Sequence, residues 1–251
     1  KLKSEASNFP LEVLFLRDDD IPQYVSDGVA DLGIVGENVL LEKRKNANIL
    51  KHLGFGKCRL SIAVPRGMSL SDAKDLNGLN IATSYPVILQ NYLNENNVNA
   101  KIHEISGSVE IAPGIGLADA ICDLVSSGST LLTNGLKEVI TIFKSEAVLI
   151  SNNNLSQKKE ALVKKILFRI DAVKKAKHNK YILLNAPNEK LKDIINIIPG
   201  MKSPTILPLA QEGWSSLHSV VNENDFWDII ENLKANGAQG ILVVPIEKMV
   251  I

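Results

Sequence analysis

Short apolar, β-prone runs alternate with helical segments along the first 151 residues. Runs of this kind cover residues 11–17, 30–37, 58–65, 79–85 and 100–106. The first two runs, with an acidic helix start between them, predict a β-α-β unit. Repeated alternation of strands and helices predicts a parallel sheet with helices on its faces. A chain of 251 residues is long enough for two or more such domains.

The next segments suggest that the chain passes between two lobes. Residues 117–125 predict a strand, residues 128–135 a short helix that ends at a glycine, and residues 138–151 a long strand. A strand of that length can leave one α/β lobe and enter another. Ligands commonly bind in a cleft between lobes.

The pattern changes after Asn152. Residues 156–178 predict a long basic amphipathic helix, whose charged side is interpreted as a solvated face and not as a membrane or nucleic-acid surface. Its apolar side is expected to consist of Leu162, Ile166, Ile170 and Val173. The rest of the chain reads β-α-β-β-α-β, which is the order of a ferredoxin-like domain.

The composition excludes several classes of protein. Lys plus Arg number 28 and so do Asp plus Glu, so no net positive field attracts nucleic acid. No apolar run approaches the roughly 18 residues of a membrane helix. Cys58 and Cys122 are far apart, and the four histidines have no ligand-type spacing, so we expect neither a disulfide framework nor a fixed metal cage. A reducing cytoplasm fits this cysteine usage.

The stretch "ADAICDLVSSGSTL", residues 118–131, is the strongest functional signal. It places Asp123 at the carboxyl end of a predicted strand, where open α/β sheets bind ligands, and a hydroxyl-rich turn follows. The turn offers backbone N–H groups and hydroxyls to a phosphate, and the acid can accept hydrogen bonds from a sugar diol. The turn consists of Ser126, Ser127, Gly128, Ser129, Thr130 and Leu131. Spacing alone leaves two interpretations open: a ribose 5-phosphate site, or a helix cap beside a solvated acid.

The same stretch resembles the signature of ATP phosphoribosyltransferase, in the long, histidine-regulated form of that family. Other stretches resemble the family in the same order: "RDDDIP", "DGVADLGIVGENVL", "CRLSIAVP", "IATSYP", "GSVEIAP", "KYILLNAP", "PTILPLA" and "VVPIEKM". Together they cover almost the whole chain. The family's first strand and its "KSGRL"-like loop have no counterpart from Lys1 onward.

The resemblance implies that N1 of ATP attacks the anomeric carbon of phosphoribosyl pyrophosphate and expels pyrophosphate, with Mg2+ present. It implies catalytic roles for Asp123 and Glu110, places Asp119 and Asp123 at the ribose, and maps the sugar-phosphate loop onto residues 126–131. Magnesium carried by the substrate suits such acids, because this ion keeps its waters and takes few protein oxygens. Further substrate contacts in the cleft are expected from Arg17, Asp20, Glu37 and Arg59.

The resemblance also implies an ACT-like regulatory domain. In the family this domain packs between subunits of a homo-oligomer, from dimer to hexamer, and binds histidine as a feedback inhibitor. The expected regulatory contacts are Asn185, Met201, Thr205 and Gly240. Asn185 stands where a family acid would meet the ammonium group of histidine, and Gly240 stands where some members carry a hydroxyl residue.

Pattern and resemblance together predict an α/β protein with a two-lobed, periplasmic-binding-protein-like catalytic core and a C-terminal ferredoxin-like, ACT-like domain. We expect lobe I from residues 1–65 and 143–155, lobe II with the phosphoribosyl loop from 66–142, a linking helix at 156–178 and the regulatory domain at 179–251. The alternative is a two-lobed ligand-binding or effector domain without chemistry. Such domains do not ordinarily combine an acid-then-hydroxyl loop with an ACT-like module.

Overall fold

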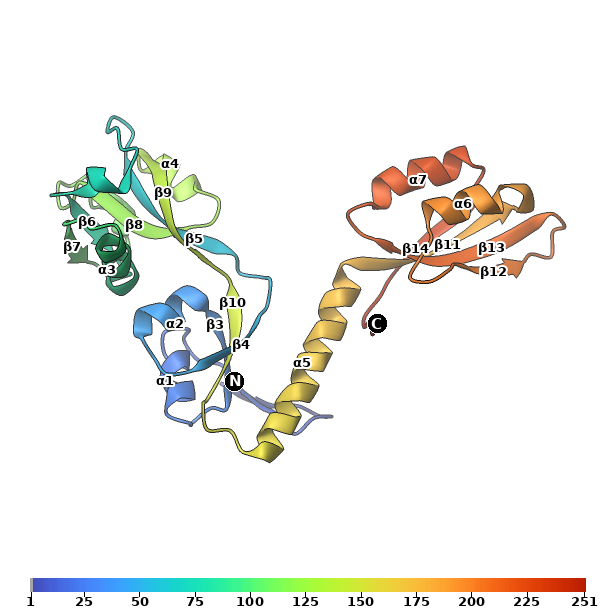
Figure 1. Cartoon of the computed structure of the whole chain (residues 1–251), viewed down its shortest axis with the longest axis horizontal. Helices are drawn as coiled ribbons and strands as arrows, with labels where there is room; N and C mark the ends of the chain where they lie inside the picture. Colours follow the sequence, from blue (N-terminus) through green and yellow to red (C-terminus); the bar gives the residue numbers. More distant parts are fainter. Residues whose placement is uncertain (1) are drawn as a thin grey trace. The chain divides into compact units, whose positions relative to one another are not determined.

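The computed structural model describes residues 2–251 and divides into two compact units. Unit 1 ends at Leu155, and unit 2 spans Ser156–Ile251 (Figure 1). Within residues 2–251, no helix is both long and apolar enough to cross a membrane. Each unit has its own hydrophobic core.

The first lobe of unit 1 is a three-stranded antiparallel sheet, in the order β3-β10-β4, with two helices and a separate hairpin. Its elements are β1 (Lys3–Glu5), β2 (Glu12–Leu14), α1 (Ile21–Ser26), β3 (Leu32–Gly36), α2 (Glu37–Lys43), β4 (Asn48–His52) and β10 (Ala147–Ser151). Pro22 in the first turn of α1 suits a helix start, because its ring fixes the helical φ. A Cβ at Gly33 would lie 2.6 Å from Ile21, so glycine lets α1 pack closely on β3.

The second lobe is a five-stranded mixed sheet in the order β7-β6-β8-β5-β9. Its elements are β5 (Cys58–Pro65), η1 (Ala73–Leu76), β6 (Asn80–Thr83), α3 (Pro86–Glu95), β7 (Lys101–Glu104), η2 (Val109–Ile111), β8 (Ala120–Val125), α4 (Ser129–Thr133) and β9 (Leu136–Ser145). Strands β7, β6 and β8 are parallel, whereas β5 runs antiparallel to β8 and β9. Core side chains cover both faces of this sheet, including fully buried Ile62, Ile81 and Ile121.

Unit 2 has the predicted ferredoxin-like topology. Four antiparallel strands lie in the order β12-β13-β11-β14, and α6 and α7 cover one face (Figure 1). Its elements are α5 (Gln157–Lys177), β11 (Asn179–Pro187), η3 (Asn188–Lys190), α6 (Leu191–Ile197), β12 (Thr205–Pro208), β13 (Trp214–Asn222), α7 (Phe226–Ala235) and β14 (Gln239–Pro245). Alternate residues of β11, such as Ile182 and Leu184, are buried toward the helices, as the period of a strand requires.

Three predictions about unit 1 need correction. The two sheets are not parallel throughout: the first lobe is antiparallel and the second is mixed. Residues 11–37 do not form a β-α-β unit, because β2 pairs with β1 whereas β3 pairs with β10. Strand β5 belongs to the sheet of the second lobe, so the expected lobe boundary at residue 65 lies one strand too late. The apolar pattern of a strand does not show which partner it pairs with.

The predicted passage between lobes is present, but it consists of two strands. β9 ends at Ser145 in the sheet of the second lobe, and β10 begins at Ala147 in the sheet of the first. Helix α5 follows its prediction closely, with Ser156 accepting a hydrogen bond from the Lys159 N–H at 3.4 Å. Val173 was expected on the buried side, yet it is 50% exposed, and Ala172 is buried instead.

Candidate functional site

The hydroxyl-rich loop follows β8 directly. Gly128 has a φ of +80°, a left-handed conformation that favours glycine, and it precedes the short helix α4. The Ser127 Oγ lies 3.0 Å from the Ser129 Oγ and accepts a hydrogen bond from the Ser129 N–H at 3.4 Å. Within residues 2–251, the N–H groups of Gly128, Thr130 and Leu131 donate no hydrogen bond. The loop therefore presents several donors at the end of β8.

Leu131 contributes to this loop through its backbone only. Its side chain is buried in the core beneath the loop, together with Val125 and Leu136. Leu131 was expected among the substrate-binding residues, but with its side chain buried only its N–H group is open to a ligand. The buried side chain anchors the loop on the sheet, because withdrawing it would expose apolar surface to water.

Asp123 and Glu110 lie close enough to influence each other. Asp123 is a half-buried residue of β8 and accepts a hydrogen bond from the Leu124 N–H at 2.8 Å. Burial raises the pKa of the Asp123 carboxyl, the Leu124 hydrogen bond opposes that shift, and the charge of Glu110 raises the pKa further. Glu110 comes from η2, which packs against β8. The structure thus places two carboxylates beside the loop.

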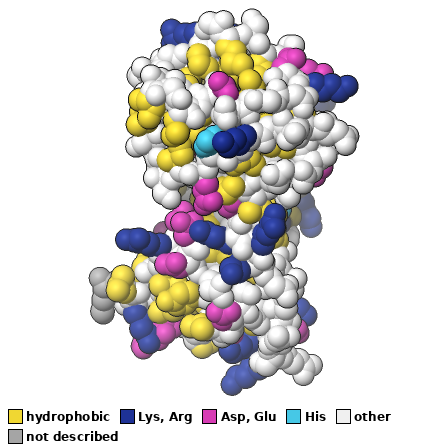
Figure 2. Space-filling view, turned by 90° about the vertical axis from the view of Figure 1, so that its left-hand side faces the viewer, with side chains coloured by type: hydrophobic (Ala, Val, Ile, Leu, Met, Phe, Trp, Pro, Cys, Tyr) yellow, Lys and Arg dark blue, Asp and Glu magenta, His cyan; other side chains and the backbone are white. Residues whose placement is uncertain are grey.

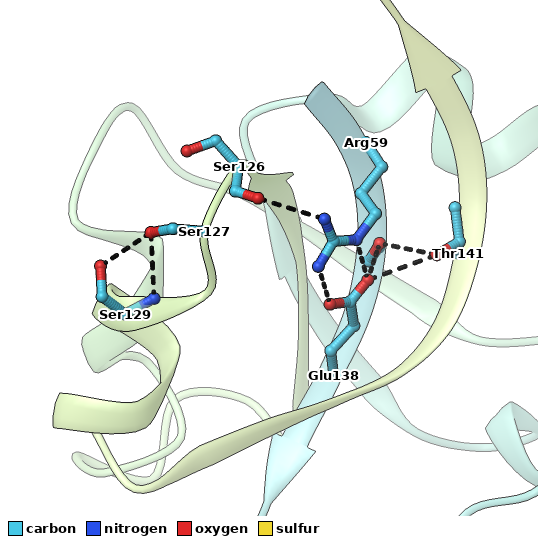
Figure 3. A network of polar contacts seen from close by, with 7 residues as sticks. Arg59, Ser126, Ser127, Ser129, Glu138 and Thr141 are labelled. Atoms are coloured by element: carbon cyan, nitrogen blue, oxygen red, sulfur yellow. Dashed lines mark hydrogen bonds and ion pairs between the residues drawn. The ribbon is translucent and has the colours of Figure 1, made fainter. Parts of the chain in front are cut away.

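Arg59, an expected substrate contact, is hydrogen-bonded within the protein. Its Nε and Nη2 each donate to the Glu138 carboxylate at 2.5 Å, and its Nη1 donates to the Ser126 carbonyl at 3.2 Å (Figure 3). The Ser61 hydroxyl donates to Glu138 at 2.8 Å. The hydrogen bond from Arg59 is the main reason that the pKa of the Glu138 carboxyl is lowered.

Tyr85 and Glu138 are candidate functional residues that the sequence analysis missed. Tyr85 is partly buried at the start of α3, and burial together with the charge of Asp123 raises its pKa to about 12. The neighbouring Asn38 side chain opposes this shift of the Tyr85 pKa, whereas the charges of Asp18 and Asp19 add to it. Because Asp18 and Asp19 belong to the first lobe, Tyr85 marks where the two lobes meet near the loop. No motif signals a single tyrosine of this kind.

The predicted site residues of the first lobe lie in an exposed turn and at the start of a helix. Arg17 and Asp20 lie in one exposed turn, in which the Asp20 N–H donates to the Arg17 carbonyl at 3.0 Å. Glu37, at the start of α2, lies 3.8 Å from His52 Nδ1, which is closer, at 3.3 Å, to Glu146. Figure 2, which views unit 1 from its end, shows acidic and basic side chains gathered at the narrow waist between the lobes.

Asp119 does not lie with the loop. It precedes β8, so four residues of strand, about 13 Å, separate it from Asp123. Its carboxylate accepts hydrogen bonds from the backbone N–H of Asn80 at 2.8 Å and from the Asn80 side chain at 3.0 Å. These bonds lower the pKa of the Asp119 carboxyl. The structure therefore does not bring the two expected ribose contacts together, and the Asp119 carboxylate joins β6 to the start of β8.

Unit 2 divides the four expected regulatory residues between two regions of its sheet. Asn185 on β11 lies beside Gly240, where a Cβ would stand 3.3 Å from the Asn185 Nδ2. Thr205 is on β12, opposite His218 of β13, and Met201 precedes that strand. Since β13 and β11 separate β12 from β14, one copy of the chain does not gather all four residues.

Residues 17–172 match the family described as ATP phosphoribosyltransferase, and residues 176–248 match the family described as HisG, C-terminal domain. The chain is 63% identical over 249 residues to the ATP phosphoribosyltransferase of Cytophaga hutchinsonii, covering 99% of this chain and 87% of that relative. It is 62% identical over 247 residues to the enzyme of Bacteroides thetaiotaomicron, covering 98% and 87%.

A solved structure agrees with these relatives. The ATP phosphoribosyl transferase (HisG:HisZ) complex from Thermotoga maritima superposes with a TM-score of 0.58 at 28% identity, covering 68% of this chain and 86% of that chain. The family matches run through both units, so the alternative of a ligand-binding domain without chemistry is not favoured. The chain belongs to the ATP phosphoribosyltransferase family, in the long form with an additional C-terminal domain, and catalyses the first step of histidine biosynthesis.

Proposed function

We propose that the loop from Ser126 to Leu131 binds the 5-phosphate of phosphoribosyl pyrophosphate. The observation that carries this proposal is the set of three unbonded N–H groups, at Gly128, Thr130 and Leu131, at the end of β8. Serine and threonine hydroxyls stand beside them, and an anion can accept hydrogen bonds from both kinds of donor. Each such bond to a charged group contributes on the order of 1.5–3 kcal/mol.

Asp123 is assigned to the ribose. In the transferase reaction, the bond from the anomeric carbon to pyrophosphate breaks as the bond to N1 of ATP forms, and the ribosyl centre becomes cationic. A half-buried carboxylate stabilises such a charge more strongly than a carboxylate in water does. Glu110 increases the negative potential at Asp123 and is assigned to the same task. No covalent nucleophile is required, because the adenine ring nitrogen attacks directly.

ATP is assigned to the side of the loop where the first lobe approaches. The turn with Arg17 and Asp20 is the proposed contact surface, because the neighbouring charges of Asp18 and Asp19 act on Tyr85 of the second lobe. Glu37, at the start of α2, is proposed as a further substrate contact from the first lobe. Holding both substrates in line is the main task of these residues.

Enzymes of this family are metal-dependent, and magnesium is the proposed metal. Within residues 2–251, no three His, Cys, Asp or Glu side chains form a group that could hold a metal ion. Asp123 and Glu110 nevertheless fit a cation that arrives on the substrate, because they repel each other and magnesium needs only one or two protein carboxylates. When bound, the ion would neutralise the charge of the departing pyrophosphate.

Unit 2 is assigned a regulatory role, with histidine as the inhibitor and a homo-oligomer, from dimer to hexamer, as the working form. The separation of Asn185 and Gly240 from Met201 and Thr205 supports a site shared between copies. The free thiols of Cys58 and Cys122 support a location in the reducing cytoplasm.

Calorimetric titration with phosphoribosyl pyrophosphate and magnesium tests the loop, and ATP turnover in the same sample tests the complete site. Thr130→Val removes a hydroxyl donor, and we expect it to weaken phosphoribosyl pyrophosphate binding about tenfold while ATP binding stays unchanged. Asp27→Asn, an exposed change after α1, serves as the control. An unchanged dissociation constant for Thr130→Val would remove its hydroxyl from the phosphate site.

A further inference from the structure

The guanidinium of Arg59 joins two parts of the second lobe. On one side it forms a two-bond fork with the Glu138 carboxylate, with both distances at 2.5 Å. On the other side its Nη1 donates to the carbonyl of Ser126, the first residue of the loop, at 3.2 Å. Ser61 and Thr141 also bond to Glu138, at 2.8 and 3.3 Å. The chain of contacts therefore runs from β9 through β5 to the loop (Figure 3).

This contact fixes the orientation of one peptide group. A trans peptide is planar, and its C=O and N–H point in opposite directions. Holding the Ser126 carbonyl toward Arg59 therefore directs the Ser127 N–H away from Arg59. Figure 3 shows Ser127 and Ser129 on the opposite side of Ser126 from Arg59. If this peptide flipped, its carbonyl oxygen would face the loop's donors and would repel a phosphate.

Glu138 sets both the orientation and the charge balance of the Arg59 side chain. The carboxylate compensates the charge of Arg59 and accepts from two of its five N–H groups, and the Ser126 carbonyl accepts from a third, so the attraction of Arg59 for an anion is reduced. A rigid fork between arginine and a carboxylate also restricts the arginine side chain to one orientation. The Arg59 and Glu138 side chains are 34% and 25% exposed. Such a pair lies deep enough to keep its geometry and close enough to the surface to reach the loop.

We propose that Glu138 is a positioning residue for phosphoribosyl pyrophosphate: it holds Arg59 against the Ser126 carbonyl and thereby keeps the Ser126–Ser127 peptide in its phosphate-binding orientation. This inference rests on the proposal that the loop binds the 5-phosphate. It differs from the simpler view in which Arg59 itself binds the substrate. The two views predict opposite effects when the charge of Glu138 is removed.

The deciding variant is Glu138→Gln. A glutamine amide cannot accept both bonds of the fork, so Arg59 loses its fixed orientation. We expect the dissociation constant for phosphoribosyl pyrophosphate to rise about tenfold or more, with the KM for ATP unchanged. If Arg59 were a direct phosphate ligand, removing the opposing carboxylate would lower that dissociation constant. A constant that falls or stays the same overturns the proposal.

Three further variants make the result specific. Arg59→Lys keeps the positive charge but loses the fork, and we expect the same weakening; wild-type affinity in this variant would overturn the proposal. Glu95→Gln removes one exposed carboxylate at the end of α3 and controls for net charge. Thr130→Val separates the two hypotheses: weakening by Thr130→Val without weakening by Glu138→Gln refutes only the positioning role. All titrations are run well below each variant's melting temperature, so that lost stability is not mistaken for lost affinity.

Discussion

At the scale of single residues, the role proposed for Asp123 conflicts with the stability of the fold. Its carboxyl is half-buried beside Glu110, and burial raises its pKa. Folding therefore disfavours the ionised form, and the stability associated with this group falls as the pH rises through its folded-state pKa. A residue that weakens the fold at neutral pH is a candidate for function.

Asp123→Asn should therefore have opposite effects on stability and on activity. We expect kcat to fall by about 100-fold or more, because the cationic ribosyl centre loses its opposing charge. The melting temperature should rise by a few degrees at pH 7, and this gain should shrink as the pH falls toward about 4, where an unfolded aspartate becomes protonated. Steady-state kinetics and thermal unfolding from pH 4 to 8 measure both. Unchanged kcat in the folded variant would remove Asp123 from catalysis.

The site could be predicted from sequence only in part. The acid-then-hydroxyl stretch identified Asp123 and the loop, because strand end, glycine and hydroxyls follow one another in the chain. The bonds of Asp119 to Asn80 could not be predicted, since they depend on the pairing of β8 with β6. The fork between Arg59 and Glu138 could not be predicted either, because the two residues lie 79 positions apart in the chain. Contacts between distant residues leave no local pattern.

At the level of elements, the N-terminus of helix α3 is capped by a residue of another helix. Tyr85 occupies the N-cap and makes no side-chain cap hydrogen bond. Instead, the Glu42 carboxylate of α2 accepts hydrogen bonds from the N–H groups of Val87 at 2.9 Å and Ile88 at 3.0 Å. A carboxylate at this position also interacts favourably with the helix dipole. Glu42 therefore ties an element of the first lobe to an element of the second.

Glu42→Ala should lower the free energy of unfolding by about 1 kcal/mol, the usual effect of removing a helix cap. Glu42→Gln retains one acceptor and should lose less. Urea denaturation measures the midpoint, and Glu95→Ala at the exposed end of α3 is the matched control. If Glu42→Ala unfolds at the same urea concentration as the wild type, the carboxylate contributes nothing to the helix start.

The elements themselves were more predictable than their partners. The strand prediction for residues 58–65 matches β5, Cys58–Pro65, because a mainly apolar run ends there at a proline. All six elements predicted after α5 are present in order. The direction of strand pairing in unit 1 was wrong, since alternating strands and helices favour a parallel sheet on average but do not determine each partner. β4, NILKH, was missed because it contains only two apolar residues, Ile49 and Leu50, and no regular alternation.

At the level of the whole molecule, the proposed regulation by unit 2 can be tested by placing one negative charge at residue 185. Asn185 is half-buried on β11, on the sheet face away from α6 and α7, since its neighbours Leu184 and Ala186 are buried in the core with those helices. Gly240 lies beside it with a φ of +56°, and a Cβ there would approach the Asn185 Nδ2 to 3.3 Å. The left-handed backbone and this close approach both favour glycine at residue 240.

Asn185→Asp should strengthen inhibition by histidine if unit 2 binds the inhibitor's ammonium group at this position. A carboxylate accepts a charge-assisted hydrogen bond, which is roughly twice as strong as a neutral one, so we expect the inhibition constant to fall about tenfold. Inhibition assays measure the constant, and analytical ultracentrifugation with and without histidine follows the oligomer. Asn232→Asp adds the same charge on the exposed side of α7 and should change neither. Equal inhibition of the two variants would place the ammonium elsewhere, because only the carboxylate at residue 185 lies beside the bulge that contains Gly240.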